Sequence, residues 1–241
     1  MTDKIEQTKW FMLCESTTEE EELERQKSYH DYNKKICANI KFDGERIMAI
    51  KKDGDIILLN RRGNIVNSNF REVVEELKTL NDKDFIIDGE IISTNDDFTA
   101  LQRRALTKNP TKLKQLQAEI PVVYMVFDII SYDNTDYTYY GTGDYKTLRE
   151  RLAIMTSLFK DKTLNFIKLA EFKPVFEMLA QARAEDREGI IVKEYNGHYC
   201  KGRRCSEYQK LKFFEEAILK VIRYTENPKG IRAEDEQLNA V

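Results

Sequence analysis

Short segments of alternating apolar and polar residues recur along this chain, and they constrain its fold more than any other feature. Their length and their period of two are typical of half-buried β-strands. They cover residues 36–42, 47–51, 56–60, 85–92, 122–130, 189–194 and 217–223. The second and third segments are joined by Lys52-Asp53-Gly54-Asp55, and Arg61-Arg62-Gly63-Asn64 follows the third, so we expect hairpin turns at both places.

Four longer segments have helical spacing of apolar residues and lie between the strands. They cover residues 70–80, 98–106, 145–159 and 173–184. Hairpins followed by separate helices favour a mixed α+β fold over a regular repeat of strand and helix. We therefore expect antiparallel sheets that are flanked by helices.

The length and the termini indicate an ordinary globular protein. A chain of 241 residues can form one large domain or two small ones. The N-terminus lacks a basic segment leading into an apolar one, and no apolar run reaches the length of a membrane span. We expect a protein that is not secreted and does not bind membranes, located in the cytoplasm, the nucleoid or a viral replication site.

The cysteines and histidines show no pattern typical of a disulfide framework or a zinc site. The cysteines do not form a C-x-x-C pair, and the two histidines do not complete a common zinc pattern. We expect reduced thiols and no structural metal. The residues concerned are Cys14, Cys37, Cys200, Cys205, His30 and His198.

Charge is unevenly distributed along the chain, although the net charge is only −3. Residues 15–24 are strongly acidic, and no acid occurs between Phe98 and Ala118. Basic residues gather in that acid-free stretch and again near the end of the chain, which predicts a local phosphate-binding face. Solvated surface is the alternative. The two clusters are Arg103, Arg104, Lys108, Lys112 and Lys114, and Lys201, Arg203, Arg204, Lys210 and Lys212.

The segment Lys41-Phe42-Asp43-Gly44-Glu45-Arg46 carries the clearest chemical signal. It follows an apolar run and places an amine, a carboxylate, a flexible glycine and a fixed cation close together. A lysine at the end of a strand can attack phosphorus when part of it is kept neutral. The segment is thus a candidate site of covalent nucleotidyl transfer, although Asp-Gly is also an ordinary turn.

Further groups suited to this chemistry follow in order. Asp88 and Glu90 lie two residues apart on one strand, so their carboxylates face the same side. Phe127 and Asp128 end another strand. Glu188 precedes a strand that carries Lys193, and Lys210 and Lys212 share one face of an extended segment. Each of these motifs alone is typical of an ordinary surface or core segment. Their occurrence together and in this order favours a site of nucleotidyl transfer.

From Trp10 to Lys212, this series of motifs resembles the nucleotidyltransferase domain of ATP-dependent DNA ligases, an ATP-grasp-like fold. The wider superfamily includes RNA ligases and mRNA capping enzymes. Leu101-Gln102-Arg103-Arg104 is more similar to DNA ligases than to capping enzymes.

The resemblance implies a role for each motif residue. Lys41 would attack the α-phosphorus of ATP and become adenylylated. Arg46 would hold the ribose, Arg61 a phosphate, and Phe127 would stack on the adenine. Glu90 would lie at the ribose and near a metal, and Glu188 would bind metal. The other nucleotide contacts would be Asn39, Ile40, Lys193, Arg204, Lys210 and Lys212, and the DNA contacts Arg103, Arg104 and Lys108.

The resemblance also implies ATP as AMP donor, Mg²⁺ as metal and nicked duplex DNA as partner of a monomeric protein. The AMP would pass to the 5′-phosphate of the nick, which the adjoining 3′-hydroxyl would then seal. A hard cation suits carboxylate and phosphate oxygens.

Two departures from the family pattern matter. Asn39 stands where the family usually has a glutamate that reads the adenine amine, although an amide oxygen can accept the same hydrogen bond. We expect the adenylation domain at residues 1–214. Residues 215–241 would supply only the hinge and first strand of an OB domain that is truncated or absent, with a turn at Asn227-Pro228-Lys229-Gly230.

Two other functions stay open. An RNA ligase or capping nucleotidyltransferase would differ in its choice of ATP or GTP and of DNA or RNA nicks. A non-catalytic nucleotide- or nick-binding module would form no covalent AMP. The presence of Lys41, Glu90, Glu188 and Lys210 together argues against such a module.

Overall fold

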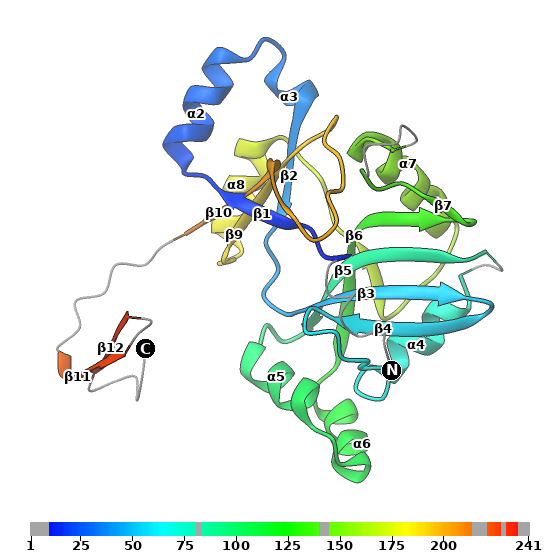
Figure 1. The fold of residues 1–241 in the computed structure, drawn as a ribbon. Coiled ribbons are helices and arrows are strands. Elements are labelled where there is room, and N and C mark those ends of the chain that lie inside the picture. Colours follow the sequence, from blue (N-terminus) through cyan, green and yellow to red (C-terminus); the bar gives the residue numbers. More distant parts are fainter. Residues whose placement is uncertain (1–9, 81–82, 140–144, 214–220, 228–229, 236–241) are drawn as a thin grey trace.

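Two β-sheets and the helices around them form the main body of the protein (Figure 1). The structure is a computed structural model and describes residues 10–80, 83–139, 145–213, 221–227 and 230–235; in the last two segments, only the backbone is described. The α+β prediction is confirmed. Within the described residues, no helix is long and apolar enough to cross a membrane.

The larger sheet has six strands in the order β4-β3-β5-β6-β7, and β8 pairs with β6. Most of its pairings are antiparallel, whereas β8 runs parallel to β6, which the sequence did not predict. Its strands are β3 (Glu45–Lys52), β4 (Asp55–Asn60), β5 (Phe85–Ser93), β6 (Val122–Tyr132), β7 (Thr135–Asp136) and β8 (Ile167–Leu169). The hairpin between β3 and β4 lies at the predicted Asp53-Gly54 turn, where both residues have positive φ.

The smaller sheet has four strands in the order β1-β10-β9-β2. The outer strand β1 runs parallel to β10, so segments from the two ends of the chain lie side by side (Figure 1). The strands are β1 (Leu13–Ser16), β2 (Ile36–Ile40), β9 (Gly189–Glu194) and β10 (Arg204–Lys212). All five residues of β2 are buried, four of them apolar or thiol side chains and the fifth the polar Asn39.

A third, separate sheet pairs β11 (Val221–Asn227) with β12 (Gly230–Asp235). The predicted strand at residues 217–223 falls partly on residues 214–220, which lie outside the described residues. The pairing of Asn227 with Gly230 fits the predicted turn. The assignment of this part to an OB domain stays a prediction.

The predicted helices are all present with small shifts in their ends. They are α4 (Arg71–Lys78), α5 (Phe98–Leu106), α7 (Leu148–Phe159) and α8 (Val175–Ala184). The start of the predicted helix at 145–159 moves to Leu148 because Thr147 caps it and forms a capping box with Glu150. Three helices were not predicted: α2 (Glu19–Ser28), α3 (Tyr32–Lys35) and α6 (Pro110–Glu119).

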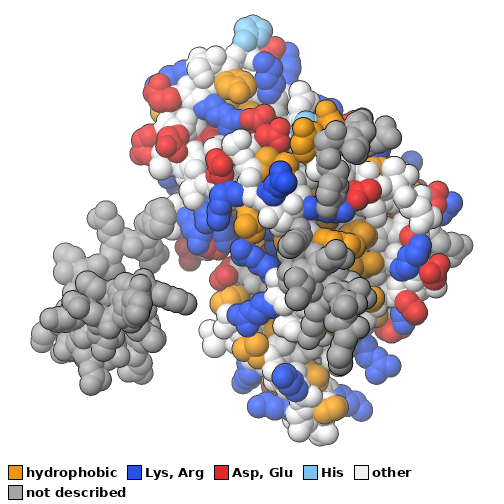
Figure 2. Space-filling view, viewed as in Figure 1, with side chains coloured by type: hydrophobic (Ala, Val, Ile, Leu, Met, Phe, Trp, Pro, Cys, Tyr) orange, Lys and Arg blue, Asp and Glu red, His pale blue; other side chains and the backbone are white. Residues whose placement is uncertain are grey.

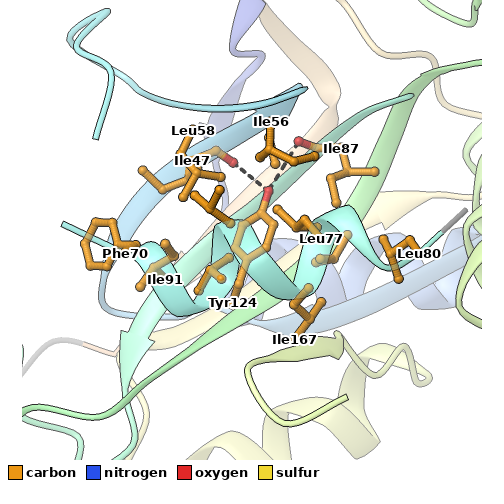
Figure 3. Packing of buried hydrophobic residues seen from close by; sticks show 14 of the residues in the cluster. Ile47, Ile56, Leu58, Phe70, Leu77, Leu80, Ile87, Ile91, Tyr124 and Ile167 are labelled. Atoms are coloured by element: carbon orange, nitrogen blue, oxygen red, sulfur yellow. Dashed lines mark hydrogen bonds between the residues drawn. The ribbon is translucent and has the colours of Figure 1, made fainter. Parts of the chain in front are cut away.

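The larger sheet packs its main hydrophobic core against α4 and α7 (Figure 3). Tyr124 on β6 is fully buried in this core, and its hydroxyl donates to the carbonyl oxygens of Ile47 and Ile87 at 2.9 and 3.3 Å. A buried hydroxyl must find such partners, because an unpaired one costs free energy. Tyr124 therefore fixes β6 against β3 and β5, the strands that carry Arg46 and Glu90 toward the site.

Arg104 belongs to this fold and not to a DNA-binding surface, so that expectation was wrong. Its side chain is fully buried on the inner face of α5. The guanidinium donates to the carbonyl oxygens of Asn69 at 2.9 Å and Ile120 at 2.6 Å and forms an ion pair with Glu72. Because the side chain has no exposed surface, it is not available to a phosphate.

Candidate active site

A pocket of about 340 Å³ lies where residues of both sheets meet. The four-stranded sheet contributes residues on or next to all four of its strands, and the six-stranded sheet contributes side chains of β3, β5 and β6. Every residue expected at the nucleotide lines this pocket together with Lys41. They are Asn39, Ile40, Arg46, Arg61, Glu90, Phe127, Lys193, Arg204, Lys210 and Lys212.

Lys41 comes directly after β2, and its backbone N–H donates to the carbonyl oxygen of Gly189 at 2.9 Å. The chain then crosses to the other sheet through Gly44. A Cβ at this position would clash with the carbonyl oxygen of Ile91 on β5. The glycine of the K-x-D-G segment is therefore needed for the close approach that places Lys41 beside Glu90.

Glu188 is the immediate partner of Lys41. Its two carboxylate oxygens form ion pairs with the ammonium groups of Lys41 and Lys212, and all three side chains are partly exposed. Burial raises the pKa of Glu188, but the hydrogen bonds from Lys212 and Lys41 outweigh it and hold the pKa below its ordinary value. Glu188 thus carries a negative charge that joins Lys41 to Lys212 at the end of β10.

Arg46 is held in place by Asp88. The guanidinium donates to both carboxylate oxygens, at 3.1 and 2.7 Å, and also to the carbonyl oxygen of Met12 at 2.8 Å. The hydroxyl of Tyr199 donates to Asp88 at 2.6 Å. Since Asp88 is fully buried, these bonds compensate its charge and fix the orientation of Arg46 at the pocket.

Glu90 faces the same pocket but has a different electrostatic environment. Burial raises its pKa from 4.5 to about 8, although the charges of Arg46 and Lys41 act in the opposite direction. The side chain is therefore largely protonated near neutral pH when the pocket holds no ligand. A cation or a ribose hydroxyl at this position would change that balance.

Phe127 lies between two cations on the pocket wall. The guanidinium carbon of Arg46 is 5.6 Å and the ammonium of Lys193 is 4.9 Å from the centre of its ring. Lys193 is only 4% exposed and also lies over the rings of Phe172 and Tyr208, and burial lowers its pKa. An aromatic ring in this setting offers a flat apolar surface for a base.

Asn39 is only 2% exposed and supplies an unsatisfied acceptor. Its Nδ2 donates to the carbonyl oxygen of Ile40 at 2.7 Å, whereas its buried Oδ1 has no hydrogen-bond partner among the described residues. Because such an atom is costly to leave unpaired, it suggests a ligand donor. Asn39 lines the pocket, so the donor could be an amine of a bound base.

The remaining cations of the pocket are more accessible. Arg61 follows β4 and is exposed, and Arg204 at the start of β10 is exposed and donates to the carbonyl oxygen of Cys14. Lys210 is half-buried on β10. In Figure 2, several Lys and Arg side chains gather where the upper and lower parts of the molecule meet.

The sequence analysis missed a buried network behind the pocket. Arg151 on α7 donates to both carboxylate oxygens of Asp128, at 2.7 and 3.0 Å, and to the hydroxyl of Tyr208 at 2.6 Å. Asp128 and Tyr208 both line the pocket. Asp128 stood out in the sequence as an acid at a strand end, but nothing marked Arg151 as its distant partner.

The acid-free segment contributes no residue to the pocket around Lys41 or to the wider hollow next to it. Arg103 is exposed and 3.6 Å from Glu119, and Lys108 is exposed after α5. Neither lines the pocket of about 340 Å³ or the wider hollow of about 1000 Å³, which shares Lys41 and Lys212 with that pocket and also contains Glu188. The DNA-binding role of Arg103 and Lys108 stays a prediction.

Comparisons with known proteins agree with this geometry. The family described as ATP dependent DNA ligase domain matches residues 11–212. A DNA ligase of Saccharolobus islandicus is 29% identical over 161 residues, which cover 64% of this chain and 26% of that protein. The chain thus spans about a quarter of the length of the curated relatives it matches.

Solved structures show the same fold. The ATP-dependent DNA ligase of bacteriophage T7, in complex with ATP, has a TM-score of 0.59 at 18% identity, with 95% of this chain and 79% of that chain covered. A structure from a study of Lig E DNA ligases has a TM-score of 0.64 at 17% identity, with 96% and 82% covered. With the family match over most of its length, this chain belongs to the ATP-dependent DNA ligase domain family.

Proposed function

We propose that this chain is the adenylating catalytic domain of a DNA ligase, which takes AMP from ATP onto Lys41 and passes it to the 5′-phosphate of nicked duplex DNA. The observation that carries the proposal is the convergence of Lys41 and all ten expected nucleotide contacts on one pocket. Those residues are spread from Asn39 to Lys212 and come from both sheets.

The nucleoside would be recognised by groups deep in the pocket. Phe127 offers a ring face for adenine, and the unpaired Oδ1 of Asn39 can accept a hydrogen bond from its amine. Arg46 is fixed by Asp88 in a position that would suit the ribose. This recognition favours a base with an exocyclic amine at the bottom of the pocket.

The transfer step would then occur at Lys41. Its neutral amine attacks the α-phosphorus, a P–N bond forms, the P–O bond to pyrophosphate breaks, and the lysine releases a proton. Lys210 and Lys212 line the pocket beside Lys41 and would stabilise the negative charge on the α-phosphate. Lys41 must also leave its ion pair with Glu188 before it can attack.

Glu188 and Glu90 fit a role at a divalent cation. Their carboxylate oxygens are hard ligands, and Glu188 is already in its charged form between two ammonium groups. Magnesium at this position would screen the repulsion between the polyphosphate and the acidic side chains. Glu188 and Glu90 would hold the cation there, and Lys41 would have to leave Glu188 for its amine to react.

The DNA steps follow from the family and from the later chemistry of a lysyl-AMP. The adenylate would be transferred to a 5′-phosphate, and the adjoining 3′-hydroxyl would displace AMP and seal the strand. Arg103 and Lys108 are exposed and available for backbone phosphates. We propose a monomer acting on nicked duplex DNA, with an OB domain as a further partner for this domain.

The test is covalent labelling with ATP that carries the label in its α-phosphate. Wild type should acquire one label per chain, and Lys41→Ala and Lys41→Arg should acquire none, because a guanidinium stays protonated and cannot attack. Lys34→Ala removes an exposed lysine paired with Asp31 and serves as the matched control.

Two further arms separate the alternatives. Labelling with GTP in place of ATP would indicate a capping-type enzyme, and sealing of RNA nicks in preference to DNA nicks would indicate an RNA ligase. Full labelling of either Lys41 variant would contradict the proposal.

A further inference from the structure

Two cysteines and a glutamate meet at the turn that precedes β10. Cys200 precedes this turn and Cys205 is the second residue of β10, with their Sγ atoms 3.6 Å apart. Glu207 follows Cys205 on the same face of the strand, and its Oε2 is 3.2 Å from the Sγ of Cys205. The three ligand atoms all lie within 4.8 Å of one another, and their residues are partly buried.

The distance between the two sulfurs is close to one edge of a tetrahedral metal site, and the distance from Cys205 to Glu207 is somewhat shorter than the corresponding sulfur–oxygen edge. Zinc–sulfur bonds of about 2.3 Å at tetrahedral angles place two sulfurs about 3.8 Å apart, and zinc–oxygen bonds of about 2.1 Å give a slightly shorter sulfur–oxygen edge. Thiolate ligands select Zn²⁺ over hard cations such as Mg²⁺. We propose that Cys200, Cys205 and Glu207 bind one Zn²⁺ ion, with water in the fourth position.

The surroundings hold the glutamate in place. Oε2 of Glu207 accepts a hydrogen bond from the backbone N–H of His198 at 3.1 Å, and Oε1 lies 3.5 Å from His198 Nδ1. The His198 ring packs edge-on against Tyr145 with 4.3 Å between the ring centres. Carboxylates that bind metal are commonly fixed by such outer hydrogen bonds.

Lys201 and Arg204, two of the cations near the turn, have partners outside the cluster. Lys201 forms an ion pair with Asp136 at 2.7 Å, and Arg204 donates to the carbonyl oxygen of Cys14. Neither contact involves the two sulfurs or Glu207. Their positive charges are therefore partly compensated by groups outside the cluster.

A metal at this position would stabilise the turn and would not take part in the transfer reaction. Tyr199 and Arg204, which flank the two cysteines, line the nucleotide pocket, whereas Cys200, Cys205 and Glu207 do not. Zinc would fix the two ends of the turn and so the positions of Tyr199 and Arg204. Four residues separate the two cysteines, which departs from the C-x-x-C pattern and explains why the sequence predicted no metal.

A disulfide between Cys200 and Cys205 is the alternative to a zinc site. The two can be distinguished by the role of Glu207. A bond between the sulfurs would require a distance of about 2.0 Å and no carboxylate. Zinc requires thiolates together with the third ligand. Replacing Glu207 should therefore weaken metal binding, although it would leave a disulfide unaffected.

The experiment is titration of the reduced, chelator-treated full chain with Co²⁺ in the absence of ATP and Mg²⁺, followed by displacement with Zn²⁺. We expect one Co²⁺ per chain, with a sulfur-to-metal charge-transfer band and the intense visible bands of four-coordinate cobalt. Replacing both thiols (Cys200→Ser with Cys205→Ser) should abolish these bands. Cys37→Ser removes a buried thiol on β2 and should leave them unchanged.

Glu207→Gln keeps both thiols and the size of the side chain, so it remains informative if the double variant does not fold. We expect it to weaken Zn²⁺ binding by about tenfold or more. Three results would overturn the proposal: a reduced wild type that binds no Co²⁺, sulfur bands that persist in the folded double cysteine variant, or an unchanged affinity in Glu207→Gln. None of these readouts depends on adenylation.

Discussion

Two charged networks meet at the nucleotide pocket, and they differ most in exposure. The Arg151–Asp128 pair is almost completely buried, with side chains 0% and 2% exposed. The network of Lys41, Glu188 and Lys212 is open to solvent, with 22%, 28% and 36% exposed. The first is almost inaccessible to solvent, whereas the second can be reached by a ligand.

The difference shows how one site can be both rigid and reactive. A buried ion pair must have every polar atom satisfied, because an unpaired charge in the interior is very unfavourable. Such a network can hold strands in place but cannot exchange partners. Exposed ion pairs contribute little to stability, so their members are free to exchange a carboxylate for a phosphate or a cation.

The largest effect should come from breaking the buried network. Arg151→Met removes one member and leaves Asp128 as an uncompensated buried charge, so the free energy of unfolding should fall by about 3–5 kcal/mol. Denaturant unfolding measures this change. Arg149→Met on the same helix, where the arginine is exposed, is the matched control and should cost far less. Equal losses in both variants would show that burial of the Arg151 pair is not what matters.

A cation on the accessible side of the pocket should show the opposite pattern, with a large effect on the reaction and a small effect on stability. Lys210→Met removes a half-buried positive charge that we propose to act at the α-phosphate, so it should slow lysyl-AMP formation by about a hundredfold to a thousandfold. The free energy of unfolding should change by less than about 0.5 kcal/mol. Single-turnover labelling and denaturant unfolding are the two measurements. Lys168→Met, an exposed lysine on β8 outside the pocket, should leave both unchanged.

Glu90 belongs to neither network. Its pKa of about 8 makes the stability of the protein depend on pH near neutrality. Because the pKa is raised in the folded state, the folded protein binds the proton more tightly than the unfolded chain. The resulting stability is fully present below the ordinary pKa of 4.5 and is lost as the pH rises through about 8.

Unfolding of the ligand-free protein at several pH values tests this. Wild type should lose stability relative to Glu90→Gln as the pH rises between about 5 and 9, because glutamine does not ionise. Parallel pH profiles for the two proteins would mean that Glu90 does not titrate in this range.

The smallest effect should come from the surface helix α5. Arg103→Ala should lower the slope of log DNA affinity against log salt by about one unit and leave ATP labelling unchanged. Lys27→Ala on α2, at the opposite end of the molecule in Figure 1, is the control. An unchanged slope in Arg103→Ala would assign α5 to ordinary solvated surface.

The parts of the fold that could be predicted are those with local signals. Helix α5 was predicted with its observed bounds because its apolar spacing is regular. Helix α2 was missed although Thr18 and Glu21 form a capping box, since the run of glutamates around it resembles an acidic tract. The parallel pairing of β1 with β10 has no local signal, because it depends on residues at opposite ends of the chain.

In the site, too, residues with a local sequence signal could be predicted, and residues whose partners are set by tertiary packing could not. Residues around Lys41 could be placed because their motifs are short and ordered. Arg104 could not, because a buried and an exposed arginine look the same in a sequence until packing places the carbonyl oxygens of Asn69 and Ile120 around one of them. The partnership of Arg151 with Asp128 is likewise set by tertiary structure.

The most direct test of the central claim is to locate the covalent AMP. Intact mass followed by peptide mapping of the wild type, after incubation with ATP and Mg²⁺, should find one AMP on the peptide that contains Lys41, attached to its Nζ. Pyrophosphate should remove it by reversing the step. AMP on another residue, or a protein that binds ATP but never acquires AMP, would contradict the account.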